Sequence, residues 1–389
     1  MTALSLDLPT ADGQLRSYTL QGRPAEALAG PPPKTRLAFA APHVIPDPLR
    51  ASASDPGVVD MSATLAVRRR LWDLGLAVAE VMDTSQRGMG LDWSSASALV
   101  EASLDAARTA GGRIACGAGT DHLPADQAHD LGRIRDAYLE QCSFIEERGG
   151  QVILMASRAL AAASRTPEDY LQIYDDVLTQ LRAPVILHWL GPAFDPQLTG
   201  YWGSADLAAA AETLLALICD HDDQIEGVKV SCLDRDLELA LRRRLPDRVR
   251  MFTGDDFNYV ELIEGDEGGH SDALLGIFSA IAPAAALALR ALDAGDVARY
   301  RAVLDPTLPL SRHLFAAPTR YYKTGIAFLA WLNGHQAHFR MLAGLESSRS
   351  VLHLTEAFIL ADRAGALADP QLAVHRMGGF LALAGAGRP

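Results

Sequence analysis

The sequence predicts an α/β fold, a (β/α)8 TIM barrel with a short N-terminal hairpin extension and a C-terminal helical appendage. Eight short apolar segments recur at intervals of roughly 25–40 residues, and Ala/Leu-rich stretches with helical spacing separate most of them. The 389 residues leave room for a barrel of about 250 residues and its appendages. The predicted strands are 37–41, 76–82, 113–117, 151–156, 184–189, 226–231, 249–253 and 274–279.

Three segments are expected along the chain: an N-terminal extension and linker (1–35), the barrel (36–310) and a helical segment (311–389). Alternating leucines near the N-terminus and a turn at Asp12-Gly13 predict the hairpin, and three consecutive prolines then predict a stiff connector. After residue 311 the pattern is helical only, with helices expected at 322–343 and 351–364.

Helices are also expected between the strands, for example at 133–147 and at 167–181, where Thr166-Pro167-Glu168 is a good helix start. The apolar run 273–289 contains Pro283 and predicts a buried strand followed by a helix rather than a membrane span. An open, doubly wound sheet is the alternative to a closed barrel. No glycine-rich dinucleotide or phosphate-binding fingerprint follows any strand, which favours the barrel.

Composition narrows the class of protein. The net charge of −13 argues against nucleic acid and anionic membranes as main partners, because both require a cationic face. The four cysteines contain no C-x-x-C pair and are expected to be reduced thiols. The first residues show no secretory signal, so we expect a cytoplasmic homo-oligomer, a dimer or tetramer, that binds a small molecule.

Lysine is rare in this chain: of 35 basic residues only Lys34, Lys229 and Lys323 are lysines. Lys229 lies within an apolar predicted strand, whose alternation places Gly227, Lys229 and Ser231 on the inner face of the barrel. Burial lowers the pKa of a lysine and favours the free amine, the form that attacks a carbonyl group to make an imine. The alternative is a structural lysine paired with a nearby carboxylate.

Polar residues gather where the predicted strands end, which is where barrel enzymes carry their active sites. This ring holds both signs of charge and suits a small polar substrate. Its members are His43, Asp47, Glu80, Asp83, Thr84, Ser85, Gln86, Arg87, Thr120, Asp121, His122, Ser157, Arg158, His188, Trp189, Lys229, Ser231, Asp255 and Asp256.

Two motifs at consecutive predicted strands resemble those of a known family. Ile225-Glu226-Gly227-Val228-Lys229 resembles the strand-six motif of the dihydrodipicolinate synthase and N-acetylneuraminate lyase family of class I aldolases, and Phe252-Thr253-Gly254-Asp255-Asp256 resembles its strand-seven S/T-G-D-D. Pro184 to His188 is similar to the family's P-V-I-L-Y, and Val81 to Ser85 lies where the family has G-T-T. The resemblance covers roughly residues 36 to 370 and indicates a divergent bacterial branch of that family.

The resemblance implies an imine between Lys229 and a 2-oxo acid, and a substrate carboxylate held by the segment containing Asp83, Thr84 and Ser85. The family's strand-four tyrosine is missing, because that stretch reads Met155-Ala156-Ser157-Arg158-Ala159. His188 is the preferred acid/base in its place, since a neutral imidazole can take and give a proton near neutral pH.

Four further residues complete the predicted substrate site. Arg87 and Arg158 are candidate carboxylate anchors through bidentate contacts, and Ser231 and Asp255 are candidate substrate contacts. The leading hypothesis is a lyase, aldolase or dehydratase that acts on a small 2-oxo acid or keto sugar and needs no cofactor beyond the lysine imine.

Two other functions stay open. Glu80, Asp83, His122 and His188 come from neighbouring strand ends and could bind a divalent metal in an isomerase or aldolase, although no tight ligand spacing supports the set. The third hypothesis is a barrel that has lost catalysis and binds a sugar or organic acid.

Overall fold

The barrel is closed. The computed structural model describes residues 4–26, 28–50, 58–83 and 85–387, and its eight parallel strands pair in the order β10-β3-β4-β5-β6-β7-β8-β9. All eight predicted strands are present, so the predicted barrel is confirmed. The strands are β3 (Ala38–Ala40), β4 (Ala77–Glu80), β5 (Ile114–Ala118), β6 (Gln151–Leu154), β7 (Val185–Leu190), β8 (Ile225–Ser231), β9 (Arg250–Thr253) and β10 (Asp272–Leu275).

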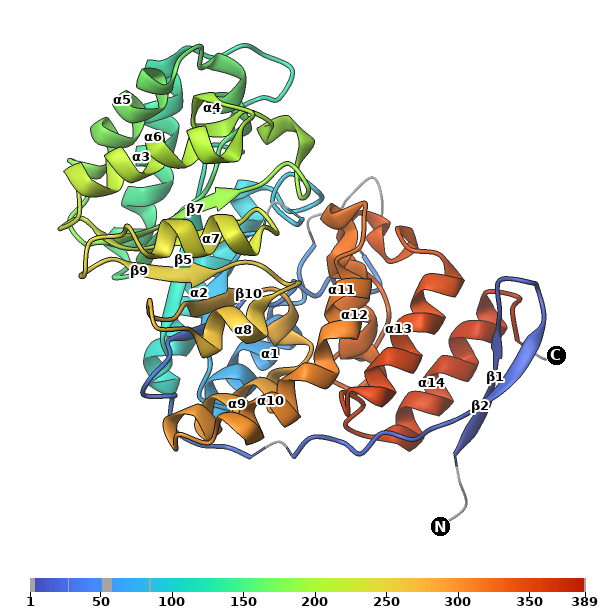
Figure 1. Ribbon diagram of the computed structural model, residues 1–389. Helices are drawn as coiled ribbons and strands as arrows, with labels where there is room; N and C mark the ends of the chain where they lie inside the picture. Colours follow the sequence, from blue (N-terminus) through green and yellow to red (C-terminus); the bar gives the residue numbers. More distant parts are fainter. Residues whose placement is uncertain (1–3, 27, 51–57, 84, 388–389) are drawn as a thin grey trace.

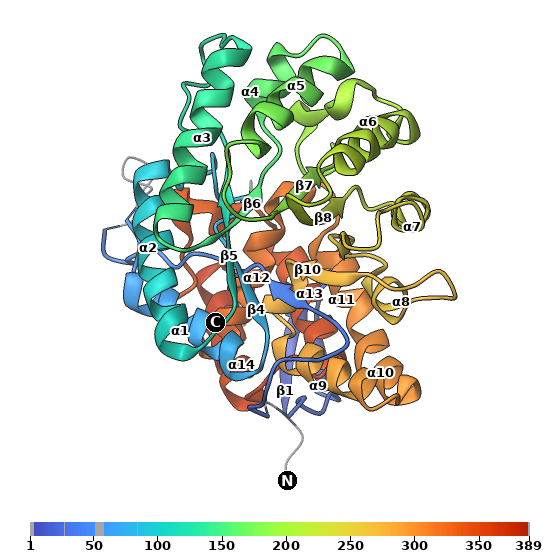
Figure 2. The same cartoon turned by 90° about the vertical axis from the view of Figure 1, so that its left-hand side faces the viewer.

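Helices surround the strands (Figures 1 and 2). The helices that follow the strands are α1 (Met61–Asp73), α2 (Trp93–Ala110), α3 (Leu131–Glu147), α4 (Arg158–Ala163), α5 (Pro167–Leu178), α6 (Leu207–Asp220), α7 (Arg235–Arg242), α8 (Tyr259–Glu264), α9 (Ala282–Asp293) and α10 (Val297–Leu304). Most of them begin at an aspartate whose side chain accepts from a backbone N–H of the first turn, for example Asp60 before α1 and Asp130 before α3.

Side chains alternate between the two faces of each strand. The outer faces pack against the helices, and a smaller inner cluster that includes Phe39, Ala79, Ile153 and Phe252 fills the barrel. Because both faces are buried, the strands consist of nearly continuous apolar runs, and this made them predictable. Gly227 is required inside, since a Cβ there would lie 2.6 Å from the Phe252 ring.

The C-terminal helices form a group beside the barrel (Figure 1). They are α11 (Leu308–Leu314), α12 (Tyr322–Leu332), α13 (Val351–Arg363) and α14 (Pro370–Leu383). The predicted helix 322–343 is wrong in its second half: α12 ends at Leu332, and Gly334 adopts a positive φ of 76° in the turn that follows. The predicted strand 274–279 likewise ends early, and Ile277–Ser279 is a 3₁₀ turn.

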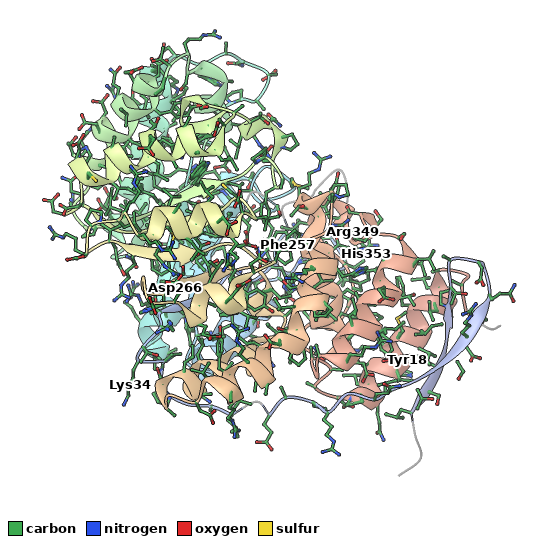
Figure 3. The ribbon with its side chains drawn as sticks, in the orientation of Figure 1. Tyr18, Lys34, Phe257, Asp266, Arg349 and His353 are labelled. Carbon is green, nitrogen blue, oxygen red and sulfur yellow. The ribbon has the colours of Figure 1, made fainter. Side chains whose placement is uncertain are left out.

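The N-terminal hairpin consists of β1 (Ser5–Pro9) and β2 (Leu15–Thr19), and it lies against α13 and α14. Asp362 of α13 accepts from the Tyr18 hydroxyl and from the backbone N–H groups of Gln21 and Gly22. The chain then runs from the hairpin to the barrel, so Tyr18 and Lys34 lie at opposite ends of the molecule (Figure 3). None of the helices in the described ranges is long and apolar enough to cross a membrane.

Candidate active site

Lys229 points into the barrel near the carboxyl end of β8, as the strand alternation predicts. Its side chain is 5% exposed, and its Nζ donates to Met82 Sδ at 3.7 Å. Gly254 makes room for it, because a Cβ at that position would lie 2.8 Å from Lys229 Cε and 2.1 Å from Ser231 Oγ. Burial lowers the pKa of Lys229, and the positive charge of Lys323 adds to that effect.

Two carboxylates, one after β4 and one after β9, act on Lys229. Burial alone would raise the pKa of Asp83, but the charges of Lys323 and Lys229 outweigh it and hold that pKa below its usual value. Asp256 follows β9, and its Oδ1 accepts from the Ile277 N–H at 2.9 Å. Burial raises the pKa of Asp256 to about 8. A carboxyl group with that pKa can both give and take a proton near neutral pH.

The C-terminal helix α12 contributes to this site, which the sequence analysis missed. Lys323 Nζ lies 2.7 Å from Asp83 Oδ2 and donates to the Ala41 carbonyl oxygen at 2.5 Å. The hydroxyl of the preceding residue, Tyr322, also interacts with the Asp83 carboxylate. The segments that follow β3 and β4 and the first turn of α12 therefore meet at Lys323.

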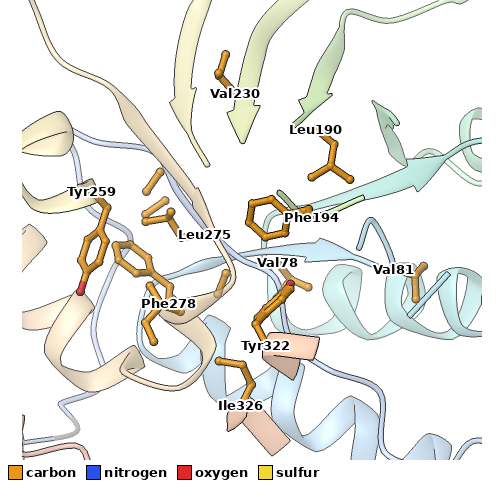
Figure 4. Close-up of a cluster of buried hydrophobic side chains, with 14 of the residues drawn as sticks. Val78, Val81, Leu190, Phe194, Val230, Tyr259, Leu275, Phe278, Tyr322 and Ile326 are labelled. Carbon is orange, nitrogen blue, oxygen red and sulfur yellow. The ribbon is translucent and has the colours of Figure 1, made fainter. Parts of the chain in front are cut away.

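The Tyr322 ring fixes the position of α12 over the barrel. It stacks on Phe315 with ring centroids 4.2 Å apart and meets Phe194 edge-on at 6.1 Å. Figure 4 shows Tyr322 and Phe194 pointing toward one another at the ends of the strands. Gly276 permits the close approach, because a Cβ there would lie 2.7 Å from the Tyr322 ring.

His188 lies beside Lys229 in the β7–β8 register and also faces inward. Its Nε2 shares a hydrogen bond of 3.2 Å with Ser231 Oγ, and its Nδ1 is buried without a partner among the described residues. Burial and the charge of Lys229 hold the pKa of His188 well below its usual value. A low pKa favours the neutral imidazole and makes it a poor base, so the acid/base role of His188 stays a prediction.

Arg87 does not fit its predicted role as a carboxylate anchor. It is buried, and all five of its N–H donors are engaged: by both oxygens of Asp121, the Gln141 amide oxygen and the carbonyl oxygens of Val81 and Gly117. This network supports an unusual backbone conformation at the end of β4, where the β-branched Val81 has a φ of 43°. Arg87 thus shapes the segment that carries Asp83.

A cavity of about 250 Å³ opens at the ends of β5 and β6. Thr120 and Ser157 line it with hydroxyl oxygens 2.6 Å apart, and Arg158 lies at its rim with its Nε 2.5 Å from Asp195 Oδ2. Arg158 is about one-third exposed and keeps donors for an anion, so it fits the predicted anchor better than Arg87.

Two methionines separate this cavity from the lysine. Met155 lines the cavity, and a Cβ on Gly117 would lie within 3 Å of both Met155 Sδ and Met82 Cα. Met82 in turn contacts Lys229 Nζ. Larger cavities of about 430 and 720 Å³ lie at the amino ends of the strands, the end of a barrel that serves stability rather than catalysis.

The remaining predicted contacts are placed as follows. Ser85 is buried in the segment after Asp83, and Thr84 lies outside the described residues. Asp255 holds its own loop: its Oδ1 accepts from the N–H groups of Phe257 and Asn258, and its Oδ2 accepts from the Asn258 amide. It is therefore a structural residue rather than the predicted substrate contact.

The four predicted metal ligands do not come together. Glu80 faces outward, where both of its oxygens accept from Arg68 and one also accepts from Ser103. His122 shares its Nδ1 with the Gln141 amide, and its Nε2 lies 3.3 Å from Glu140. Among the described residues no group of three His, Cys, Asp or Glu side chains could hold a metal ion. The predicted Glu80, Asp83, His122 and His188 set is wrong as a single site.

Asp256, Tyr322 and Lys323 are the site residues that sequence reasoning missed. Asp256 belonged to the polar ring but was not chosen, because nothing in the sequence distinguishes its environment from that of Asp255. Lys323 carried a usable signal: it is one of only three lysines and lies in the first turn of a mostly apolar helix.

The fold and the buried lysine define a (β/α)8 barrel with a lysine at the carboxyl end of its sixth strand. The chain belongs to the family described as a protein of unknown function (DUF993), whose model matches residues 6–386. No curated relative matches the chain.

Solved structures of the dihydrodipicolinate synthase family share the fold. The dihydrodipicolinate synthase from Thermotoga maritima is 15% identical, with a TM-score of 0.65 over 86% of this chain and 100% of that chain. A prophage protein of that family from Escherichia coli K12, solved in complex with pyruvate, is 14% identical, with a TM-score of 0.63 over 90% and 98%. The synthase from Aquifex aeolicus is 15% identical, with a TM-score of 0.60 over 90% and 98%. The predicted resemblance is confirmed at the level of the fold.

Proposed function

We propose that this protein is a lyase or aldolase that forms an imine between Lys229 and a small 2-oxo acid or keto sugar. The observation that carries the proposal is the environment of the Lys229 amine. It is buried at the carboxyl end of β8 and contacts a methionine sulfur, and no oxygen atom of the described residues is its hydrogen-bond partner. The pyruvate complex of the Escherichia coli K12 neighbour supports a 2-oxo acid as the first compound to test.

The chemistry requires a neutral amine and a proton carrier. The Lys229 nitrogen attacks the carbonyl carbon, and loss of one water gives a protonated imine. A base then takes the proton from the hydroxyl on the second carbon from the imine carbon; the bond between that carbon and the first one breaks, its electron pair enters the imine to give an enamine, and the other fragment leaves as a carbonyl compound. Protonation of the enamine carbon and addition of one water release the second product and restore the amine.

Asp256 is the group best suited to move these protons. Its carboxyl is buried beside Lys229, and burial raises its pKa to about 8, so the acid and the base are both populated near neutral pH. The neutral His188 and Ser231 supply a polar wall next to the amine. The imine is itself the electron sink, so the proposed reaction requires no cofactor.

Substrate groups distant from the carbonyl would occupy the cavity above β5 and β6. Thr120 and Ser157 offer hydroxyls there, and Arg158 offers a cation at the rim. These groups suit a compound with a carboxylate and hydroxyls. Met82 must turn aside for the carbonyl carbon to reach Lys229, because its sulfur now occupies the approach to the amine.

Enamine formation can be tested without knowing the second reactant. Pyruvate and a panel of other 2-oxo acids and keto sugars are incubated with the protein in D2O, and exchange of the protons next to the carbonyl is followed by NMR. We expect catalysed exchange with at least one compound, unchanged rates in Lys34→Met and background rates in Lys229→Met. Equal exchange in folded Lys229→Met and in the parent protein would overturn the proposal.

A further inference from the structure

The two buried lysines of the barrel mouth face one carboxylate but contact it differently. Lys323 Nζ lies 2.7 Å from Asp83 Oδ2, whereas the Lys229 amine donates to Met82 Sδ and is attracted by Asp83 only through the electrostatic field. Both side chains are almost fully buried. Their protonation states are therefore coupled through Asp83.

The contacts of Lys323 identify it as the charged member of the pair. Its Nζ has two oxygen partners, Asp83 Oδ2 and the Ala41 carbonyl oxygen, both within hydrogen-bonding distance. Arg68 on α1 and Asp256 after β9 also act on it, with opposite signs, and His43 lies nearby as a neutral ring whose pKa burial lowers to about 3. A buried ammonium with a carboxylate and a carbonyl acceptor is satisfied.

The groups around Lys229 come from four elements. Asp83 at the end of β4 and Asp256 after β9 attract a proton to it, while Lys323 on α12 repels one. His188 on β7 is adjacent and is kept neutral by burial. The Asp83 carboxylate could form an ion pair with Lys229, but it already forms one with Lys323.

We propose that Lys323 is a positioning residue that keeps the Lys229 amine free by occupying Asp83. This inference rests on the proposed function, since a free amine matters only if Lys229 attacks a carbonyl. The helix α12 is then part of the active site. Its Tyr322 ring packs closely against Gly276 and Phe315, and this packing holds Lys323 next to Asp83.

Removal of Lys323 should therefore change the protonation of Lys229. In Lys323→Met the Asp83 carboxylate loses its cation and becomes free to pair with Lys229, and the repelling charge disappears as well. An opposite charge in direct contact shifts a pKa by about 1–3 units, so the midpoint for Lys229 should rise by about that amount. At neutral pH the fraction of free amine should fall, by at most tenfold for each unit of that rise.

Three lysines make this shift directly measurable. The whole protein is produced with lysine carrying ¹³C at Cε, and the three Cε signals are followed by NMR against pH, with Lys34 as an internal reference. We expect Lys229 to titrate below Lys34 in the parent protein and to move up in Lys323→Met. The double variant Asp83→Asn/Lys323→Met should return it to a low midpoint, because the competing carboxylate is gone.

Two results would overturn the inference: an unchanged Lys229 midpoint in Lys323→Met, or a double variant that titrates like Lys323→Met. If Lys323→Met does not fold, Asp83→Asn alone decides the matter: the midpoint of Lys323 must fall by more than that of Lys229, since only Lys323 contacts the carboxylate, and an equal or larger fall for Lys229 would overturn the inference. The titration needs no substrate, so its failure is distinguishable from failure of the imine proposal. If the parent protein catalyses proton exchange but the Lys229 midpoint does not shift in Lys323→Met, only the role of Lys323 is removed.

Discussion

Lys323 Nζ lies 2.7 Å from Asp83 Oδ2, so the first turn of α12 is in direct contact with the segment that ends β4. This contact joins the C-terminal helices to the carboxyl ends of the barrel strands. It also explains why Lys229, which faces the same acid, is left with a sulfur neighbour. The predicted boundary at residue 310 therefore separates two parts of one site.

Asp256→Asn should slow proton transfer and leave imine formation intact. General acid–base catalysis contributes about 10²–10⁴-fold to a rate, and the amide cannot exchange a proton near neutral pH. We expect deuterium exchange of the active 2-oxo compound to fall by about that factor while borohydride still traps Lys229. Asp255→Asn is the matched control, because Asp255 holds the loop through Phe257 and Asn258. Equal losses in both variants would contradict the role of Asp256.

Gly254→Ala should displace the Lys229 side chain and leave the amine group itself unaltered. The added Cβ would lie 2.8 Å from Lys229 Cε and 2.7 Å from the Val230 carbonyl oxygen, so the lysine or the strand must shift. We expect at least a tenfold loss of imine trapping, because small displacements of a nucleophile are costly. Gly132→Ala on α3, where the nearest atom is 3.4 Å away, should trap normally. Normal trapping in Gly254→Ala would show that the close packing is not required.

Glu80→Ala should destabilise the fold. The side chains of Arg68 and Glu80 are fully buried and bonded at 2.7 and 2.9 Å. Removal of one partner of such a pair costs about 3–5 kcal/mol, since the other charge is left buried and unpaired. Urea denaturation measures the change. Glu212→Ala, which breaks an exposed pair with Arg244, should change stability little, and equal effects would contradict the buried pair.

Glu238 should make stability depend on pH. It is buried beside Ser271, and burial raises its pKa from 4.5 to about 8. The folded state therefore favours the protonated acid, whose stabilisation is complete below about pH 4.5 and is lost as the pH rises through about 8.

The slope is at most about 1.4 kcal/mol per pH unit. Glu238→Gln imitates the protonated form, so it should match the parent protein near pH 4.5 and exceed it in stability at pH 8 and above. Denaturation curves at these pH values measure the difference. Parallel stabilities for the two proteins across this range would contradict a buried carboxyl with a raised pKa.

The fold could be predicted because buried parallel strands appear as continuous apolar runs, and the inward direction of Lys229 followed from alternation along one strand. The partners of the side chains could not be predicted in the same way. Arg87 and Glu80 stood at strand ends like Lys229, but their side chains pair with Asp121 and Arg68, which lie far from them in the sequence. Lys323 lay outside every predicted strand, and only the docking of α12 brings it to Asp83.

The most direct test of the account is trapping of the imine itself. The protein is incubated with each 2-oxo acid or keto sugar, reduced with borohydride, weighed intact and mapped by peptide masses. We predict one mass increment, located on Lys229, that is absent from Lys229→Met and present in Lys34→Met. An adduct on Lys323 or Lys34 in place of Lys229, or no adduct with a compound whose protons the protein exchanges, would contradict the account.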